Sequence, residues 1–471
     1  MTRVTLVDTY EESLNQRILL ACVQRAQLAS KGSGIPSMRR TSKMRWVVAC
    51  VVLVACVTHL GAAYSVLSHE EVIDLLWKDH IVPMLLRRYP ATTPDDLRKA
   101  HAYAYGGSMI QDMGYYPFGN KYFSDLLHYV RSGDFVENLI SESHDVNEYA
   151  FALGALAHYA SDTTGHPSVN RIVGMEFPHL RKKYGEFITY AQDPKAHIRA
   201  EFGLDVEQVA KNRFTSDAYH DFIGFEVAKP LLERAFQKTY GIEIKDVFAD
   251  IDLSIGSYRR AISAVIPTMT KAALLSHRDE LTRTIPNFNA KKFRYYLSRA
   301  QYEKEWGKKY QKPSVGIRIL GFFLKFVPKI GPFRALQFKM PNAAEENIYM
   351  KSMTETVEEY RKVLVQAEDG QLDLPNKDFD TGRETHAGEY VLTDKTYARL
   401  LDDLAKHHFA QLTPELRRDI LAFYVDLNAP IATKHDKKKW QRTLAELNEL
   451  KSAPINPEPA AEPSAGTGGN N

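Results

Sequence analysis

Residues 147–166 read Asn-Glu-Tyr-Ala-Phe-Ala-Leu-Gly-Ala-Leu-Ala-His-Tyr-Ala-Ser-Asp-Thr-Thr-Gly-His. This apolar pattern predicts a helix, capped by Asp145, in which His158 and Asp162 project side by side because they are four residues apart. The neighbouring exposed positions are Ala, Leu and Tyr, so an imidazole and a carboxylate are unfavourable there unless they bind something. We expect a divalent metal ion at this face, with His166 beside it.

A second pair of the same kind lies downstream, in Ala-His-Ile-Arg-Ala-Glu-Phe at residues 196–202. His197 and Glu201 are again four residues apart, so they share one helix face. Taken alone, either pair is more often a surface hydrogen bond or ion pair, and that alternative stays open for each. The two pairs together, with His166 between them, favour a metal cluster.

Composition limits the possible ligands and partners. The chain has 471 residues, 44% of them hydrophobic, and a formal net charge of +3. This length suggests two or three domains, and the charge is too small for the whole surface to bind nucleic acid. The three cysteines, Cys22, Cys50 and Cys56, all lie before the expected mature N-terminus, so the mature chain would have none. Zinc or a similar ion would therefore be bound by imidazole and carboxylate.

The N-terminal region has the pattern of an export signal. A basic run over residues 38–46 precedes an apolar run over residues 47–60, and Leu-Gly-Ala-Ala follows, ending at Ala63. This order is typical of a secretory signal peptide, so we expect a periplasmic or secreted protein whose mature chain begins at or next to Tyr64. Lipoprotein processing at Cys56 is the alternative.

Helix signals recur along the rest of the chain. Ser68, with Glu71 three residues later, predicts a capped helix start, and a second helix is expected over residues 94–105, broken by Gly106 and Gly107. No long strand-like alternation is present, which predicts an all-α fold. Further helices are expected over residues 222–232, 251–275, 350–366, 395–409 and 414–425.

Four regions follow from these signals. We expect an N-terminal extension and signal peptide over 1–63, a helical domain over 64–285, a helical C-terminal region over 286–452 and a disordered tail over 453–471. Within the third region, residues 308–339 combine lysine and arginine with an apolar stripe at helical spacing. That pattern suits contact with a membrane surface, although an amphipathic hairpin packed on the core would look the same.

The order of the polar residues resembles that of the zinc-dependent phospholipase C family, which is related to the single-strand-specific zinc nucleases. The resemblance covers roughly residues 64–204, and it implies an all-α domain that binds up to three zinc ions. The set of residues that carries it is His69, Asp112, His128, His158, Asp162, His166, His197 and Glu201.

The resemblance also implies how these ligands are shared. Asp162 would bridge two ions, of which one would also take His69 and the N-terminal amine and carbonyl of Tyr64, in place of the family's usual Trp. The other would take Asp112, His128 and His158, and the third ion would take His166, His197 and Glu201. Asp112 would also orient or deprotonate the attacking water. The long interval between His166 and His197 suggests an inserted loop.

The implied function is an exported, zinc-dependent phosphodiesterase that cleaves phospholipids as a phospholipase C does. A nuclease or nucleotidase on the same scaffold is the first alternative. Glu201 and the missing disulfides favour the phospholipase, so no stable nucleic-acid partner is expected. The second alternative is a non-catalytic protein that binds membrane surfaces through residues 308–339.

Overall fold

The computed structural model describes residues 66–211, 225–262, 266, 269–270, 273–274, 281 and 338–455. All of these residues lie in one compact unit, Cys56–Asn471, and the other unit is Met1–Ala55. Several predicted features fall outside the described residues: the signal peptide with Cys56, the first mature residue Tyr64, the basic stretch up to residue 337 and the tail beyond residue 455.

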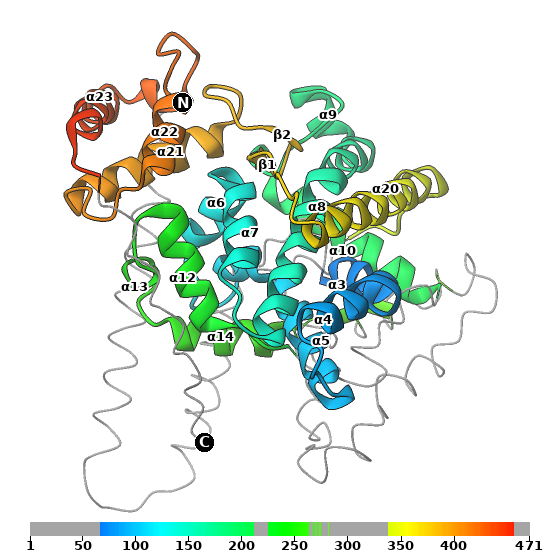
Figure 1. Ribbon diagram of the computed structural model, residues 1–471. Helices are drawn as coiled ribbons and strands as arrows, with labels where there is room; N and C mark the ends of the chain where they lie inside the picture. The colour runs from blue at the N-terminus through cyan, green and yellow to red at the C-terminus, as the bar shows by residue number, and fades with distance from the viewer. Residues whose placement is uncertain are drawn as a thin grey trace, which may run out of the picture. The chain divides into compact units, whose positions relative to one another are not determined.

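The described chain is helical, which confirms the all-α prediction (Figure 1). Its strands are two residues long and pair antiparallel, β1 (Lys377–Asp378) with β2 (Arg383–Glu384). The helices in the first part of the chain are α3 (Val66–Leu76), η1 (Trp77–Ile81), α4 (Val82–Arg88), α5 (Pro94–Ser108), η2 (Ile110–Tyr115), α6 (Lys121–Tyr129), α7 (Ser132–Ser141), α8 (Val146–Glu176), α9 (Pro178–Tyr184), α10 (Pro194–Ala210), α12 (Lys229–Tyr240), α13 (Ile244–Val247) and α14 (Ile251–Arg260). The later helices are α20 (Ala343–Glu368), α21 (Val391–Lys406), α22 (Pro414–Phe423), η5 (Ala432–His435) and α23 (Lys437–Ser452).

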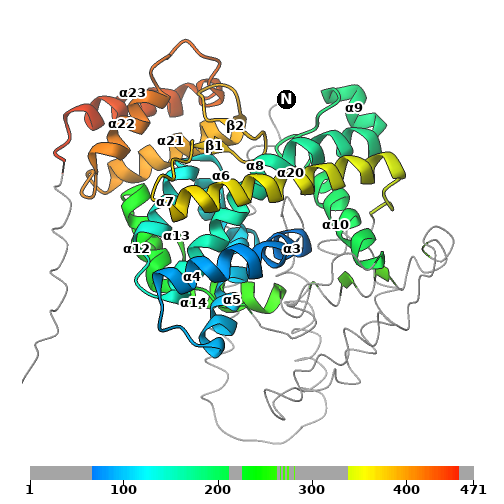
Figure 2. The same ribbon diagram turned by 45° about the vertical axis from the view of Figure 1, so that its right-hand side comes forward.

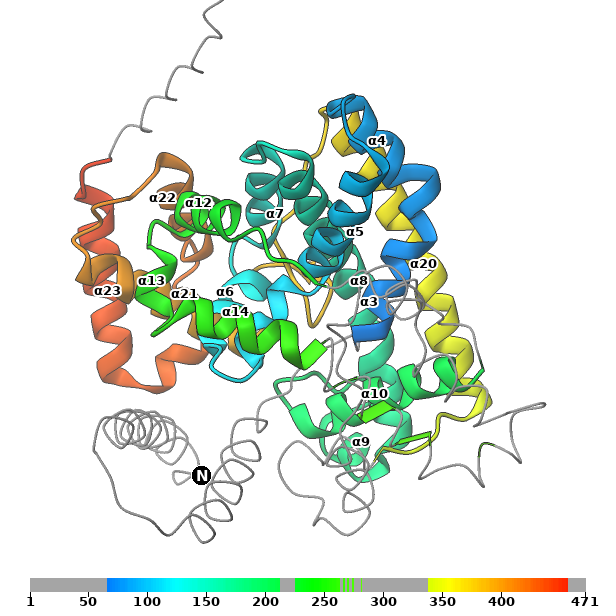
Figure 3. The ribbon, with the colours of Figure 1, turned by 90° about the horizontal axis from the view of Figure 1, so that it is seen from below.

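Helix α8 is the element against which much of the fold packs, with α5, α7, α10 and α20 as neighbours (Figures 1 and 3). Asp145 caps it as predicted, since its side chain accepts from the backbone N–H groups of residues 147 and 148. The helix continues beyond His166 to Glu176, because Val169, Ile172 and Val173 keep the apolar period and are buried. The expected inserted loop is therefore wrong in part: the interval holds the end of α8 and the short helix α9.

The predicted break at Gly106 and Gly107 is wrong, because α5 runs through both to Ser108. Both glycines allow another part of the backbone to approach closely. A Cβ atom on Gly107 would lie 1.9 Å from the Phe151 carbonyl oxygen in α8, and one on Gly106 would lie 1.8 Å from that of Glu226. Gly154 of α8 faces the Ala104 carbonyl in the same way, at 2.1 Å. Close packing of α5 on α8 explains Gly107 and Gly154, and the approach of residue 226 to α5 explains Gly106.

The predicted role of Ser68 as a helix cap is also wrong. Ser68 lies inside α3, which is helical from Val66, the first residue of the described range. Its hydroxyl group donates to Oδ1 of Asp205 at 2.6 Å, and the Leu67 N–H donates to Oδ2 of the same carboxylate at 3.0 Å. A carboxylate from α10 thus holds the start of α3, a tertiary contact that the local capping pattern did not indicate.

The C-terminal region packs on the same core as the rest of the described chain. α20 lies along α8 and α21 packs against α6 (Figure 2), and one cluster of buried apolar side chains extends from Val66 to Leu450. The predicted helices over 350–366, 395–409 and 414–425 correspond to α20, α21 and α22, and α23 is an addition. The predicted boundary at residue 285 lies outside the described residues and stays a prediction.

The helix predicted over residues 222–232 is wrong over residues 225–228, which are not helical, and right from Lys229, where α12 begins. Pro230 agrees with this start, since proline is favoured in the first turn of a helix. Of the predicted helix 251–275, α14 covers Ile251–Arg260. Within the described part of the chain, no helix combines the length and apolar character needed to span a membrane.

Candidate metal centre

Asp162 lies at the centre of four imidazoles. Nε2 of His158 is 3.1 Å from Oδ2 of Asp162, and Nε2 of His69 is 3.5 Å from Oδ1. Nε2 of His128 and Nε2 of His166 each lie 3.5 Å from Oδ2. All five side chains are buried, with no more than 2% of any of them exposed. Such a concentration of imidazole around one buried carboxylate is typical of a metal centre.

Three helices bring these groups together. The four-residue spacing along α8 places His158, Asp162 and His166 on one face, as the sequence predicts. His69 comes from α3, and its ring stacks on that of His158 with centroids 4.4 Å apart. His128 comes from the last turn of α6.

Asp112 adds a second carboxylate from η2, the 3-10 turn after α5. Its Oδ1 atom lies 3.3 Å from Nε2 of His128, and its side chain is fully buried. Among the described residues, two groups place their potential ligand atoms within 4.8 Å of one another. These groups are His69 with Asp112 and His158, and His128 with His158 and Asp162.

Backbone carbonyl groups fix the orientation of two of the imidazoles. Nδ1 of His158 donates to the Ser108 carbonyl oxygen at 2.8 Å, and Nδ1 of His128 donates to that of Ser124 at 2.8 Å. A proton on Nδ1 leaves the Nε2 lone pair of His158 directed towards Asp162. This arrangement, with an outer acceptor on the far nitrogen, is the usual one for metal-binding histidines.

The donor atoms fit a zinc ion. Among the described residues, both carboxylate oxygens of Asp112 and of Asp162, and Nε2 of His158, have no hydrogen-bond partner of good geometry. Buried lone pairs without donors are unfavourable, and a cation would compensate them. Two ligand atoms on one tetrahedral zinc lie roughly 3.3 Å apart. The separations of 3.1 to 3.5 Å around Asp162 agree with that value.

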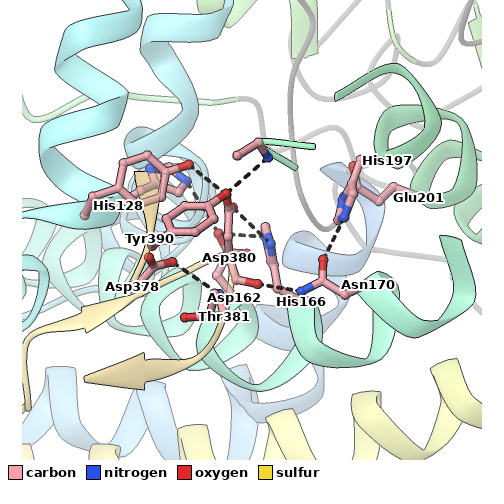
Figure 4. A network of polar contacts seen from close by, with 12 residues as sticks. His128, Asp162, His166, Asn170, His197, Glu201, Asp378, Asp380, Thr381 and Tyr390 are labelled. Carbon is pink, nitrogen blue, oxygen red and sulfur yellow. Dashed lines mark hydrogen bonds and ion pairs between the residues drawn. The ribbon is translucent and has the colours of Figure 1, made fainter. Parts of the chain in front are cut away.

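His197 and Glu201 form an adjoining and equally buried part of the site on α10. Nδ1 of His197 is 3.0 Å from Oε1 of Glu201, while Nε2 is 2.7 Å from Oδ1 of Asn170 and 2.8 Å from the Ile188 carbonyl oxygen. The ring of His166 lies 6.1 Å from that of His197 and links this pair to Asp162. Figure 4 shows both parts on one side of α8.

Electrostatics differ across the site. Burial disfavours the charged form of His128, but Asp112 and Asp162 raise its pKa to about 10. Burial and the nearby carboxylates Asp162 and Asp112 raise the pKa of Glu201 well above its usual range. Burial and the neighbouring His166 lower the pKa of His197 to about 4, so that imidazole is neutral at pH 7. A neutral imidazole is the form that binds metal.

Comparison with known families gives one match for this part of the chain. Residues 68–250 match the family described as zinc dependent phospholipase C. This part of the chain is similar to that family. The matched region contains all the candidate ligands described above. No curated protein and no solved structure matches the chain significantly.

Of the nine ligands predicted for this phospholipase C family, eight are in the described residues and Tyr64 lies outside them. The structure brings the other five ligands between His69 and His166 around Asp162, and His197 with Glu201 adjoin them. Asp112 groups with His69 and His158 and also lies 3.3 Å from Nε2 of His128, and the division of the ligands among ions stays a prediction.

Sequence analysis missed two residues at this site. Asn170, which contacts His197, continues the four-residue series that begins at His158, so the helical spacing could have indicated it. Asp380 has an oxygen 3.3 Å from Nδ1 of His166. It lies far beyond the region that matches the phospholipase C family, in a segment without helical period. The short run Asp-Phe-Asp-Thr-Gly at 378–382 was the only local sign of it.

Proposed function

We propose that this protein hydrolyses phospholipid phosphoester bonds as a zinc-dependent phospholipase C. The observation that carries the proposal is the convergence of four buried imidazoles on Asp162, with Asp112 beside them, inside a region similar to that family. Similarity to the family supports the phosphoester chemistry. The choice of a phospholipid as substrate rests on the family likeness and on Glu201 as the final carboxylate.

The residues that would hold zinc are His69, Asp112, His128, His158 and Asp162, with His166, His197 and Glu201 as the adjoining set. Bound zinc would activate water and offset the negative charge that grows on the phosphoryl oxygens. Asp162 faces imidazoles on both oxygens and so would hold the set together. His69 and His158 keep their relative orientation through ring stacking.

Asp112 is our candidate for orienting or deprotonating the attacking water. Its carboxylate is buried and has no hydrogen-bond partner of good geometry among the described residues, so both oxygens remain able to accept a proton. Tyr115, which is buried, places its ring 5.8 Å from that of His128. This aromatic cover would limit access of bulk water to one side of the site, and low local polarity strengthens charge interactions there.

The predicted signal peptide supports a further proposal, that the protein acts outside the cytoplasm. Contact of residues 308–339 with a lipid surface would bring the site to its substrate. Both proposals rest on sequence pattern. Vesicle binding by the full chain, compared with a variant whose Arg318, Lys325 and Lys329 are changed to Gln, tests the second: equal binding would contradict it.

The test of function is hydrolysis by purified full-length protein of phosphatidylcholine vesicles and, separately, of single-stranded DNA. Zinc content is measured on the same samples. We expect release of phosphocholine, a drop of roughly a hundredfold or more in Asp112→Asn, and unchanged activity in the surface control Asp79→Asn. Cleavage of DNA alone would replace the phospholipase proposal by the nuclease, and zinc without hydrolysis of either would support a binding protein.

A further inference from the structure

The hairpin formed by β1 and β2, residues 377–384, lies against the metal centre although it belongs to the C-terminal region (Figures 2 and 4). The Phe379 N–H donates to the His128 carbonyl oxygen at 3.1 Å, and the two rings are 5.1 Å apart. Nδ2 of Asn170 donates to the Asp380 carbonyl oxygen at 2.7 Å. The hairpin is therefore attached to α6 and α8, the helices that carry most of the imidazoles.

The hairpin also packs on α8 at one specific position. Pro167 has no N–H, so the Thr163 carbonyl oxygen, four residues earlier, lacks its usual helical donor. Gly382 lies directly over that carbonyl: a Cβ atom there would be 2.3 Å from the oxygen, and Gly382 has a φ of +69°. A residue with a side chain could not occupy this position without displacement. Pro167, at this contact position, directly follows His166 in α8.

The side chain of Asp380 is held so that one oxygen faces His166. Its Oδ2 atom accepts from the Tyr129 hydroxyl group at 3.0 Å and from the Tyr390 hydroxyl group. Its Oδ1 atom lies 3.3 Å from Nδ1 of His166. Two tyrosines contact Oδ2, and Oδ1 is the carboxylate oxygen that faces Nδ1 of His166.

Three imidazoles of the site share one arrangement. His128, His158 and His166 each direct Nε2 towards Asp162. The Nδ1 atom on the far side faces an acceptor in every case, a backbone carbonyl group for the first two and the Asp380 carboxylate for His166. The first two acceptors come from residues 68–250, and the third comes from outside that range.

We propose that Asp380 is a positioning residue of the metal centre, which fixes the proton of His166 on Nδ1 and leaves Nε2 free to bind zinc. The C-terminal region then completes the site that residues 68–250 begin. This inference rests on the proposed zinc site. A carboxylate behind a metal-binding imidazole orients the ring and increases its basicity.

The substitution Asp380→Asn tests this role. Its amide oxygen can still accept from the two tyrosine hydroxyl groups, which leaves the NH₂ group facing Nδ1 of His166. An amide N–H makes Nδ1 the acceptor, so the proton moves to Nε2 and blocks the atom that would bind zinc. We therefore expect zinc affinity to fall while the fold is kept.

Asp378→Asn is the matched control, because Asp378 is as buried as Asp380 and lies in the same hairpin. Its Oδ2 atom accepts from the Thr393 hydroxyl group at 2.9 Å rather than facing an imidazole. Full-length wild type and both variants are equilibrated with buffered free zinc, and bound zinc is measured by mass spectrometry. The visible spectrum of each protein with cobalt in place of zinc reports the ligand arrangement.

We expect the most weakly bound zinc ion to bind roughly 10 to 100 times less tightly in Asp380→Asn than in the wild type. The cobalt spectrum of Asp380→Asn should also change. Asp378→Asn should match the wild type in both measurements. Wild-type affinity in Asp380→Asn would overturn the positioning role. An equal loss of zinc affinity in both variants would overturn it too, since zinc affinity would then depend on the packing of the hairpin and not on the Asp380 carboxylate. A wild type that binds no zinc would instead contradict the proposed function itself.

Discussion

Helix α8 buries one carboxylate near its middle and another at its C-terminal end, and the two carboxylates behave in opposite ways. Asp162 is fully buried near the middle of the helix, and Glu176 is 4% exposed at its C-terminal end. Burial alone would raise both pKa values. At Asp162 the imidazoles, chiefly His158 and His166, outweigh burial and hold its pKa well below the usual range. At Glu176, burial and the nearby Glu345 raise the pKa to about 8.

This difference shows that burial of a carboxylate alone does not produce a candidate metal site. Neither carboxylate oxygen of Glu176 has a hydrogen-bond partner among the described residues, as at Asp162. A lysine, Lys339, donates to the Glu176 backbone carbonyl oxygen at 2.8 Å, but no imidazole among the described residues is paired with its carboxylate. Asp162 is ionised and can bind a cation together with its neighbouring imidazoles, whereas Glu176 is most stable as the neutral acid.

The largest expected effect is from Asp162→Asn, which would leave four imidazoles without their shared carboxylate. Metal assistance contributes several kcal/mol to hydrolysis, so turnover should fall on the order of a thousandfold. Zinc content should fall with it, and both are measured on the same purified sample. Full turnover in this variant would remove the distinction between the carboxylate at the middle of α8 and the one at its C-terminal end.

Removing zinc should lower the stability of the wild type. A ligand present at about a thousand times its dissociation constant adds ~4 kcal/mol to the free energy of unfolding. Thermal unfolding with and without a strong chelator measures the loss, and Asp162→Asn should show little further change on chelation. Equal melting temperatures for the wild type in both conditions would contradict a zinc site in the core.

Glu176→Gln should stabilise the protein at alkaline pH. The pKa of Glu176 in the folded state, about 8, is above its usual 4.5. The stability that its neutral form contributes is therefore complete below pH ~4.5 and is lost as the pH rises towards 8. Glutamine stays neutral, so the variant should be more stable than the wild type by a few kcal/mol at pH 8.5 and similar at pH 4.5. Denaturant unfolding at both pH values, with zinc content unchanged, checks this sign.

Asp145→Ala, at the start of α8, should have the smallest effect. It removes the acceptor for two backbone N–H groups, at 2.8 and 2.9 Å, and loss of such a cap destabilises by about 1 kcal/mol. Zinc affinity should not change, because the cap is more than three helical turns from His158. A loss of zinc in this variant would mean that the whole helix, and not its central face, controls the metal site.

The helical fold and much of the site could be predicted from local pattern. The spacing of His158, Asp162 and His166 sets their common face, because helix geometry repeats every 3.6 residues whatever the helix packs on. The Asp145 cap was predictable for the same reason. The predicted cap at Ser68 and the predicted break at Gly106–Gly107 are wrong, because both predictions use only neighbouring residues. Ser68 contacts α10, and the two glycines contact residue 226 and α8.

By itself, the sequence determined which helices form and which polar side chains they carry, because dihedral preferences and apolar spacing act within a few residues. Only the tertiary structure decided which of those side chains meet. The contact between Asp380 and His166 joins positions 214 apart in the chain, and it exists because Pro167 and Gly382 allow a hairpin to rest on α8. Contacts of that range depend on packing, which no local pattern specifies.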